Sequence, residues 1–152
     1  MRTLDHKIPP PAVGLLLAGA MWGVSLITPA IQAAPYSQIA AAIVALIGVG
    51  FDIAGIVSFR RAKTTVNPLR PNRATALVSS GIFRITRNPM YVGMLFILVS
   101  WALFLSSVWT LFGPIAFWLY MNRFQISPEE RVLAELFGSD FADYKKRVRR
   151  WL

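Results

Sequence analysis

The sequence predicts an all-α integral membrane protein with four transmembrane helices. Between Lys7 and Arg60 the only charged side chain is Asp52, and between Arg87 and Arg123 there is none. A helix that crosses a bilayer needs about 20 apolar residues. The chain is 55% hydrophobic and 15% charged, whereas soluble domains carry about 25% charged residues. The two uncharged stretches are therefore expected to lie in a membrane.

The first stretch divides into two predicted spans, at about 12–31 and 37–59. Gly19 and Gly23 form a GxxxG pattern in the first span. Such a pattern lets a second helix approach closely, but glycine is also frequent in membrane helices in general. The sequence leaves both interpretations of these glycines open.

The second stretch is too long for one ordinary helix at about 1.5 Å per residue. It predicts a helical hairpin over 89–126, with spans at about 89–106 and 108–126 and a turn near Ser106-Ser107. Pro114 is predicted to kink the fourth helix.

The basic residues are confined to one set of segments. All sixteen Lys and Arg lie in the N-terminus, in the loop 60–88 or in the tail from Arg123. This is the positive-inside pattern, and it predicts cytoplasmic termini in an inner or plasma membrane. It also explains the net charge of +9 without a nucleic-acid partner, and the basic tail can contact anionic lipid headgroups. We expect one domain over residues 1–152.

The cytoplasmic tail 127–152 is predicted to form two short helices. Ser127-Pro128-Glu129-Glu130 has the pattern of a capping box, with Ser at the N-cap, Pro at N1 and Glu at N3. Gly138 is predicted to end the first helix. The second helix presents Phe141, Tyr144 and Val148, and the loop 60–88 has an apolar side of its own, formed by Leu69, Leu77, Val78, Ile82 and Phe83.

The segment Arg87-Asn88-Pro89-Met90-Tyr91 lies where the basic loop meets the hairpin. A structural interpretation makes Arg87 a membrane anchor and Asn88 a helix N-cap. A functional interpretation uses the same helix start, whose free N–H groups suit a ligand carboxylate or hydroxyl.

Three further features bear on chemistry. Glu129 could bind a ribose or offset a sulfonium, or it could be only an acid preferred in a first helical turn. Asp52 is either a functional group inside a span or the partner of Arg60, Arg61 or a loop arginine. The sequence has no cysteine, so it offers no thiolate metal site, and no metal is expected.

These segments together resemble the isoprenylcysteine carboxyl methyltransferase family, whose integral membrane enzymes have relatives that act on phospholipid amines. The resemblance extends from Thr64 to Trp151 and covers more than half of the chain. The matching blocks are Thr64-Thr65-Val66-Asn67-Pro68, Leu77-Val78-Ser79-Ser80-Gly81-Ile82-Phe83, Arg87-Asn88-Pro89-Met90-Tyr91-Val92-Gly93, Glu129-Glu130 with Leu133, Phe137-Gly138, and Tyr144-Lys145-Lys146-Arg147-Val148.

The resemblance implies S-adenosylmethionine as the cofactor and a lipophilic or amphiphilic acceptor that enters from the bilayer. It suggests Arg123 and Glu130 as catalytic residues and Gln125 as a substrate-binding residue, at the position of a family arginine. Asn88 stands where the family usually has His. The implied cofactor contacts are Thr75, Ala76, Leu77, Val78, Phe83, Asn88, Pro89, Met90, Tyr91 and Glu129.

The implied reaction is direct displacement at the methyl carbon. A carboxylate acceptor needs only alignment and partial desolvation, whereas an amine or thiol also needs a proton acceptor, for which Glu130 or Tyr91 are the candidates. Two alternatives remain, an NADPH-dependent enzyme like the sterol reductases and a non-enzymatic four-helix membrane scaffold.

Overall fold

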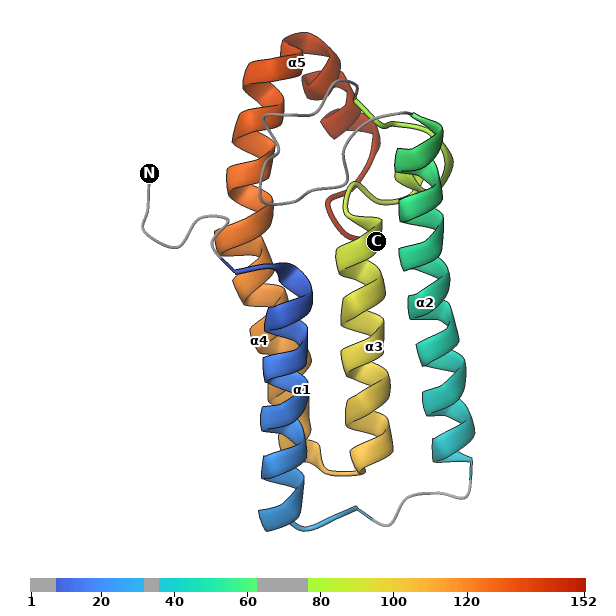
Figure 1. Cartoon of the computed structure of the whole chain (residues 1–152), viewed down its shortest axis with the longest axis vertical. Coiled ribbons are helices and arrows are strands. Elements are labelled where there is room, and N and C mark those ends of the chain that lie inside the picture. Colours follow the sequence, from blue (N-terminus) through green and yellow to red (C-terminus); the bar gives the residue numbers. More distant parts are fainter. Residues whose placement is uncertain (1–7, 32–35, 63–76) are drawn as a thin grey trace.

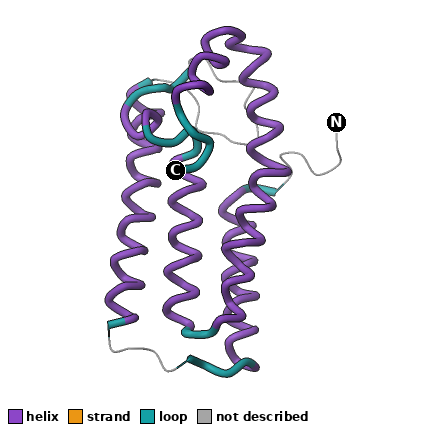
Figure 2. Tube along the Cα trace, turned by 180° about the vertical axis from the view of Figure 1, so that it is seen from behind, coloured by secondary structure: helices purple, strands orange, loops and turns teal. Residues whose placement is uncertain are grey.

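The structure, a computed structural model, describes residues 8–31, 36–62 and 77–152. The described part of the chain consists of helices joined by loops, with one isolated parallel β-bridge between Thr86 and Arg149 and no strand (Figure 2). Four helical columns run side by side, and the last of them continues beyond the others to form one end of the molecule (Figure 1).

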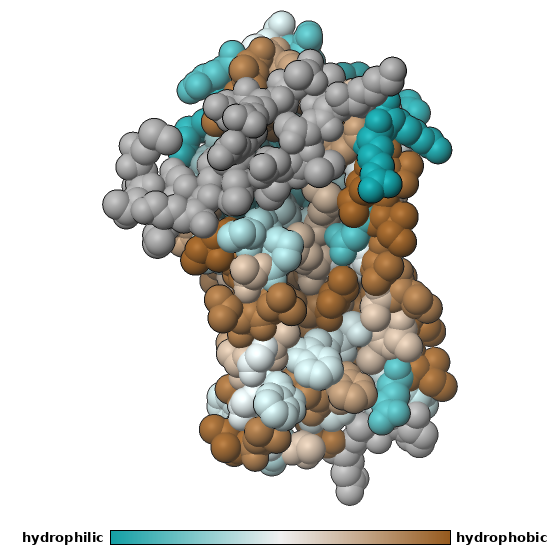
Figure 3. Space-filling model, viewed as in Figure 1, coloured by the Kyte–Doolittle hydropathy of each residue, from teal (hydrophilic) through white to brown (hydrophobic). Residues whose placement is uncertain are grey.

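Helices α1 (Pro10–Ile27) and α2 (Ser37–Arg61) are long and apolar enough to cross a membrane by length and composition. Only 17% of the most apolar window of each helix is buried. Large apolar side chains such as Leu15, Ile27 and Leu46 are at least 70% exposed. Apolar surface on this scale needs an apolar surrounding, and Figure 3 shows it over the columns, below a more polar end.

Helix α3 (Pro89–Leu105) forms the predicted hairpin with the segment that follows it. Ser106 ends the helix in a left-handed conformation (φ 51°), and its N–H donates to the Ala102 and Leu103 carbonyls. The chain then returns through η3 (Val108–Leu111) and α4 (Phe112–Tyr120). The predicted turn at Ser106-Ser107 is therefore confirmed.

The helical path after Ser107 becomes irregular at a different place from Pro114, where a kink is predicted. Pro114 lies in the first turn of α4, where a missing N–H leaves no helical hydrogen bond unmade. The irregularity falls instead at η4 (Met121–Ile126), a π-helical segment, and α5 (Ser127–Arg147) continues directly from it. The hairpin's second arm and the tail thus share one continuous helical path.

This continuity makes the predicted capping box wrong. Residue Ile126 already has helical backbone angles, and no side chain caps α5. The Ser127 hydroxyl donates to the Asn122 carbonyl at 2.6 Å instead. Gly138 does interrupt the helix, with φ 47° and ψ −118°, which confirms the predicted break.

Close packing between helices occurs at glycines other than Gly19 and Gly23. A Cβ added at either of these two would meet nothing within 4 Å. On α2, by contrast, a Cβ at Gly48 would lie 2.7 Å from the Gly93 carbonyl oxygen. The α2–α3 pair is therefore the tight crossing, whereas the GxxxG face of α1 has no neighbour within the described chain.

Asp52 lies at this crossing, against Gly93. Its Oδ1 is buried and accepts no hydrogen bond from any described residue. No ion pair with Arg60 or Arg61 occurs among the described residues, so those two predicted partners were wrong. The loop arginines Arg70 and Arg73 lie outside the described ranges.

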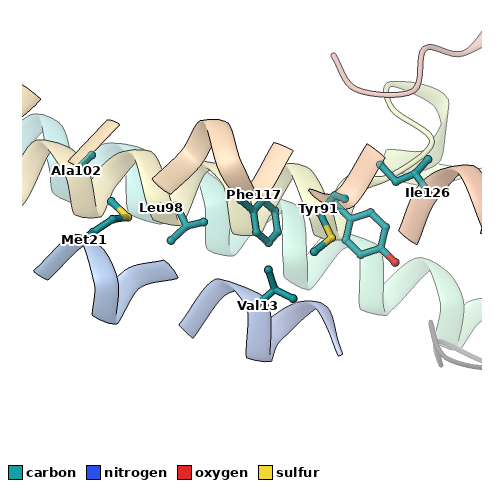
Figure 4. Close-up of a cluster of buried hydrophobic side chains, with 8 residues drawn as sticks. Val13, Met21, Tyr91, Leu98, Ala102, Phe117 and Ile126 are labelled. Carbon is teal, nitrogen blue, oxygen red and sulfur yellow. The ribbon is translucent and has the colours of Figure 1, made fainter. Parts of the chain in front are cut away.

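Two apolar clusters hold the fold together. The first joins α1, α3 and the α4–η4 path, and Figure 4 shows its labelled members spread along the helices: Val13, Met21, Tyr91, Leu98, Ala102, Phe117 and Ile126. The second joins η2 (Gly81–Arg84) and the preceding residues to the second half of α5. It contains Val78, Phe83, Phe141, Tyr144 and Val148, which confirms the predicted apolar faces of loop and tail where they are described. Leu69 lies outside the described residues.

Candidate functional site

The candidate site lies at the beginning of α3, where the chain enters the hairpin. Asn88 occupies the N-cap position, and its carbonyl accepts hydrogen bonds from the Tyr91 and Val92 N–H groups, both at 3.0 Å. Its side chain does not cap the helix. The Asn88 amide Nδ2 instead donates to the Arg150 carbonyl at 2.8 Å, so this residue links the helix start to a distant segment.

Three side chains meet one turn into the hairpin. We call them the Glu129 cluster: Tyr91, Gln125 and Glu129. The Tyr91 hydroxyl donates to Glu129 Oε1 at 2.7 Å, and Gln125 Nε2 donates to the same oxygen at 2.8 Å. Tyr91 and Gln125 are 5% and 1% exposed. Both donors bond to the same oxygen, Oε1, and hold the Glu129 carboxylate in place.

The electrostatics of Glu129 follow from this surrounding. Burial raises the pKa of Glu129 to about 7, although the hydrogen bonds from Tyr91 and Gln125 partly offset the increase. The neighbouring Glu130 charge raises the pKa of Glu129 further. A carboxylate that is costly to ionise gains more than an exposed one from a cationic or hydroxyl-bearing ligand.

Glu130, one residue along, has the opposite surrounding. Arg87 Nη2 lies 2.7 Å from Oε1, and Arg150 Nη2 lies 2.6 Å from Oε2. Lys145 Nζ is 4.0 Å from Oε2. We call these four residues the Glu130 cluster. Burial opposes ionisation of Glu130, but the arginine hydrogen bonds and charges outweigh it and lower its pKa. Glu130 is therefore a fixed anion and a poor proton acceptor.

The π-helical segment η4 positions both clusters. A π-helix has an extra residue per turn, and such segments are frequent at functional sites. Gln125 is directed from it to Glu129, four residues later. Asn122 in the same segment accepts hydrogen bonds through Oδ1 from Trp151 Nε1 at 3.1 Å and from Arg150 Nη1 at 3.4 Å.

The remaining predicted cofactor residues fall into different surroundings. Val78 and Phe83 are buried in the second apolar cluster, and Leu77 packs on it. Pro89 is buried, and Met90 faces Gly55 of α2, where an added Cβ would lie 2.8 Å from Met90 Cγ. Thr75 and Ala76 lie outside the described residues.

The two predicted catalytic residues are placed apart. Arg123 has its guanidinium 5.5 Å from the centre of the Phe124 ring, and it forms no ion pair with Glu129 or Glu130 among the described groups. Glu130 lies in the ion-pair cluster. Both catalytic roles, and the substrate role of Gln125, stay predictions.

Sequence reasoning missed the contribution of Arg150, Trp151 and Asn122. From the sequence, the basic run 145–150 is predicted to complement the helix C-terminal dipole and to contact lipid headgroups, which assigns no specific contact to Arg150. No spacing pattern distinguishes Arg150 from its exposed neighbour Arg149, because only the path of the chain after α5 directs one side chain inward. Within the described ranges, no three His, Asp or Glu residues are grouped so that they could hold a metal.

The fold defines a helical, membrane-associated protein, and comparison with known families places it among the methyltransferases. The sequence profile of the phospholipid methyltransferase family matches residues 36–140. The chain belongs to this family. The match includes α2, the hairpin and both glutamates, which confirms the resemblance found in the sequence.

Two relatives agree in part with this assignment. The chain is 44% identical over 63 residues to an uncharacterized protein of Haemophilus influenzae, along all of that protein and 41% of this chain. It is also 31% identical over 78 residues to a protein-S-isoprenylcysteine O-methyltransferase of Schizosaccharomyces pombe. The latter alignment covers 51% of this chain and 33% of the yeast protein.

Proposed function

We propose that the protein transfers a methyl group from S-adenosylmethionine to a lipophilic or amphiphilic acceptor at the cytoplasmic face of a membrane. The observation that carries this proposal is the Glu129 cluster: a carboxylate whose Oε1 is held by Tyr91 and Gln125 and whose ionisation is opposed by burial. A ribose hydroxyl or a sulfonium would be a favourable partner for such a carboxylate.

The residues of the site fit this cofactor. Glu129 would bind it, with Tyr91 and Gln125 fixing the carboxylate. Pro89 and Met90 lie at the same helix start, where Pro89 is buried and Met90 packs against Gly55 of α2. S-adenosylmethionine would supply an activated methyl group on a sulfonium, and the chain's contribution is alignment and partial exclusion of water.

The two glutamates bear on the class of acceptor. A carboxylate acceptor arrives without a proton to lose, whereas an amine must lose one. Glu129, with its pKa of about 7, can accept a proton at neutral pH. Glu130, with its lowered pKa, is a weaker proton acceptor. The phospholipid methyltransferase profile and the isoprenylcysteine O-methyltransferase relative support an amphiphilic acceptor of either type.

The proposal includes a topology of four spans with both termini in the cytoplasm. The path from Val108 to Ile126 is helical throughout, and its length of roughly 30 Å fits a bilayer core. The uncharged turn at Ser106 and Ser107 would face the outer side. Because the chain has no cysteine, single cysteines at exposed Arg84 and Trp109 can be labelled selectively in intact cells. The proposed topology requires that only Trp109→Cys reacts with an impermeant reagent.

Calorimetry of the purified protein tests the cofactor. S-adenosylmethionine and S-adenosylhomocysteine are expected to bind, whereas NADPH is not. Binding of NADPH alone would favour the reductase alternative, and binding of none of the three would favour a scaffold. A search by mass spectrometry for products labelled from methyl-labelled cofactor in membrane extract would then identify the acceptor.

A further inference from the structure

The segment Val148–Trp151, which follows α5, returns to the beginning of α3 (Figure 1). It lies outside residues 36–140, the range that the family profile matches. Its backbone pairs with the residues before α3: the Arg87 N–H donates to the Arg149 carbonyl at 2.9 Å. The Thr86 hydroxyl and the Asn88 amide both donate to the Arg150 carbonyl, at 3.2 and 2.8 Å.

Side chains of the same segment reach the other half of the site. Arg150 donates to both carboxylate oxygens of Glu130, from Nε at 3.1 Å and from Nη2 at 2.6 Å. Trp151 Nε1 donates to Asn122 Oδ1 at 3.1 Å. The segment therefore bonds at once to the start of α3 and to the η4–α5 path, the two elements that carry Tyr91 and Glu129.

The segment also spans both apolar clusters. Val148 is a buried member of the cluster around Phe83, and Trp151 packs on the cluster around Tyr91. Thr86, beneath the segment, is fully buried. Contacts on both sides restrain the segment more than a surface tail of the same composition would be restrained.

We infer that Val148–Trp151 is a clasp that sets the spacing between Tyr91 and Glu129, with Arg150 as its main positioning residue. Glu129 and Tyr91 lie 38 residues apart in sequence and share one hydrogen bond, so their separation depends on how the two elements are held. The two Arg150 bonds to Glu130 fix the residue next to Glu129, and the Arg150 carbonyl fixes Asn88.

The chain provides a matched control in Arg149. This residue has the same charge, is exposed, and contributes its backbone to the clasp. Arg149→Ala therefore removes one positive charge from the same surface and keeps the clasp bonds. Arg150→Ala removes an equal charge together with the bonds to Glu130 and Asn122.

Two measurements test the clasp, and the first does not depend on the proposed function. Hydrogen exchange of the peptide that contains Thr86, Arg87 and Asn88 should accelerate at least fivefold in Arg150→Ala and remain unchanged in Arg149→Ala. In calorimetry, S-adenosylhomocysteine should bind at least tenfold more weakly to Arg150→Ala than to Arg149→Ala, because the clasp then no longer holds Tyr91 and Glu129 at the spacing that binding requires.

The two measurements test the clasp and the proposed function separately. The exchange measurement tests the clasp alone, whereas the calorimetry rests on the proposed function. If the wild type binds no adenosyl ligand, the proposed function fails, while the exchange data still decide whether the clasp exists. If the wild type binds and Arg150→Ala binds equally well, the positioning role is wrong. If Arg150→Ala does not fold, the milder variants Arg150→Lys and Trp151→Phe test the positioning role instead. Both should weaken binding two- to fivefold with thermal midpoints close to wild type, and unchanged affinity in both would overturn the inference.

Discussion

Two adjacent glutamates in α5 have opposite surroundings. Glu130 is bonded to two arginines, which lower its pKa, whereas the hydrogen-bond donors to Glu129 among the described residues are neutral, and burial raises its pKa to about 7. The difference indicates a division of labour. The Glu130 cluster holds the η4–α5 path against α3 and the clasp, and the proposed function uses Glu129, whose charge can change near neutral pH.

Removal of Arg87 should have the largest effect on stability. Arg87→Ala removes one of the ion-pair partners of Glu130. It also removes the hydrogen bonds from Arg87 to the Val148 and Lys145 carbonyls. Loss of one partner of a buried ion pair costs about 3–5 kcal/mol, and we expect about 3 kcal/mol here because Arg150 remains. Thermal unfolding in detergent measures it. Arg84→Ala, which removes an exposed arginine of η2, is the control and should change stability little; equal losses would contradict the division of labour.

Glu129→Gln should separate binding from stability. The amide has nearly the shape of the carboxylate but no charge, so affinity for S-adenosylmethionine should fall about 10- to 100-fold, a loss of roughly 1.4–2.7 kcal/mol. Above pH 7 the unliganded variant should be more stable than the wild type, because it no longer buries a charge. Glu135→Gln, at an exposed position of the same helix, should change neither quantity. A Glu129→Gln protein that unfolds early yet binds normally would assign Glu129 a structural role.

The pH dependence has a defined sign. Glu129 binds its proton more tightly in the folded than in the unfolded protein, so its contribution to stability is present at acidic pH and is lost as the pH rises towards about 7. Ligand affinity should change in the opposite direction, falling roughly tenfold between pH 8 and pH 6 as the carboxylate is protonated. Calorimetry at a series of pH values checks this, and a profile that stays the same in Glu129→Gln would exclude Glu129 as the titrating group.

Tyr91→Phe should have the smallest effect. It removes one hydrogen bond to Glu129 Oε1, whereas Gln125 still donates to the same oxygen. Since the tyrosine hydrogen bond lowers the pKa of Glu129, the midpoint of the binding profile should move to higher pH, and affinity at pH 8 should fall about three- to tenfold, or roughly 1 kcal/mol. The matched control is Tyr120→Phe, on α4, and a similar shift there would argue against a specific Tyr91 contact.

The fold could be predicted where composition alone decides it. Hydropathy located α1 and α2 to within a few residues, and the uncharged stretch after Arg87 predicted the hairpin and its turn. Local patterns were less dependable. Ser127-Pro128-Glu129-Glu130 has the residue types of a capping box, but the preceding π-helical segment supplies helical backbone there, so no cap is needed.

The sequence by itself determined the helical, membrane-associated class, the family and the candidate status of Tyr91 and Glu129, because hydrophobic length and ordered motifs are properties of the chain's local composition. Only the tertiary structure decided which glutamate meets the arginines and that Arg150, rather than Arg149, is directed inward. The physical reason is that charge state and partner depend on burial and on contacts between residues 20 to 62 positions apart, and no local pattern encodes these.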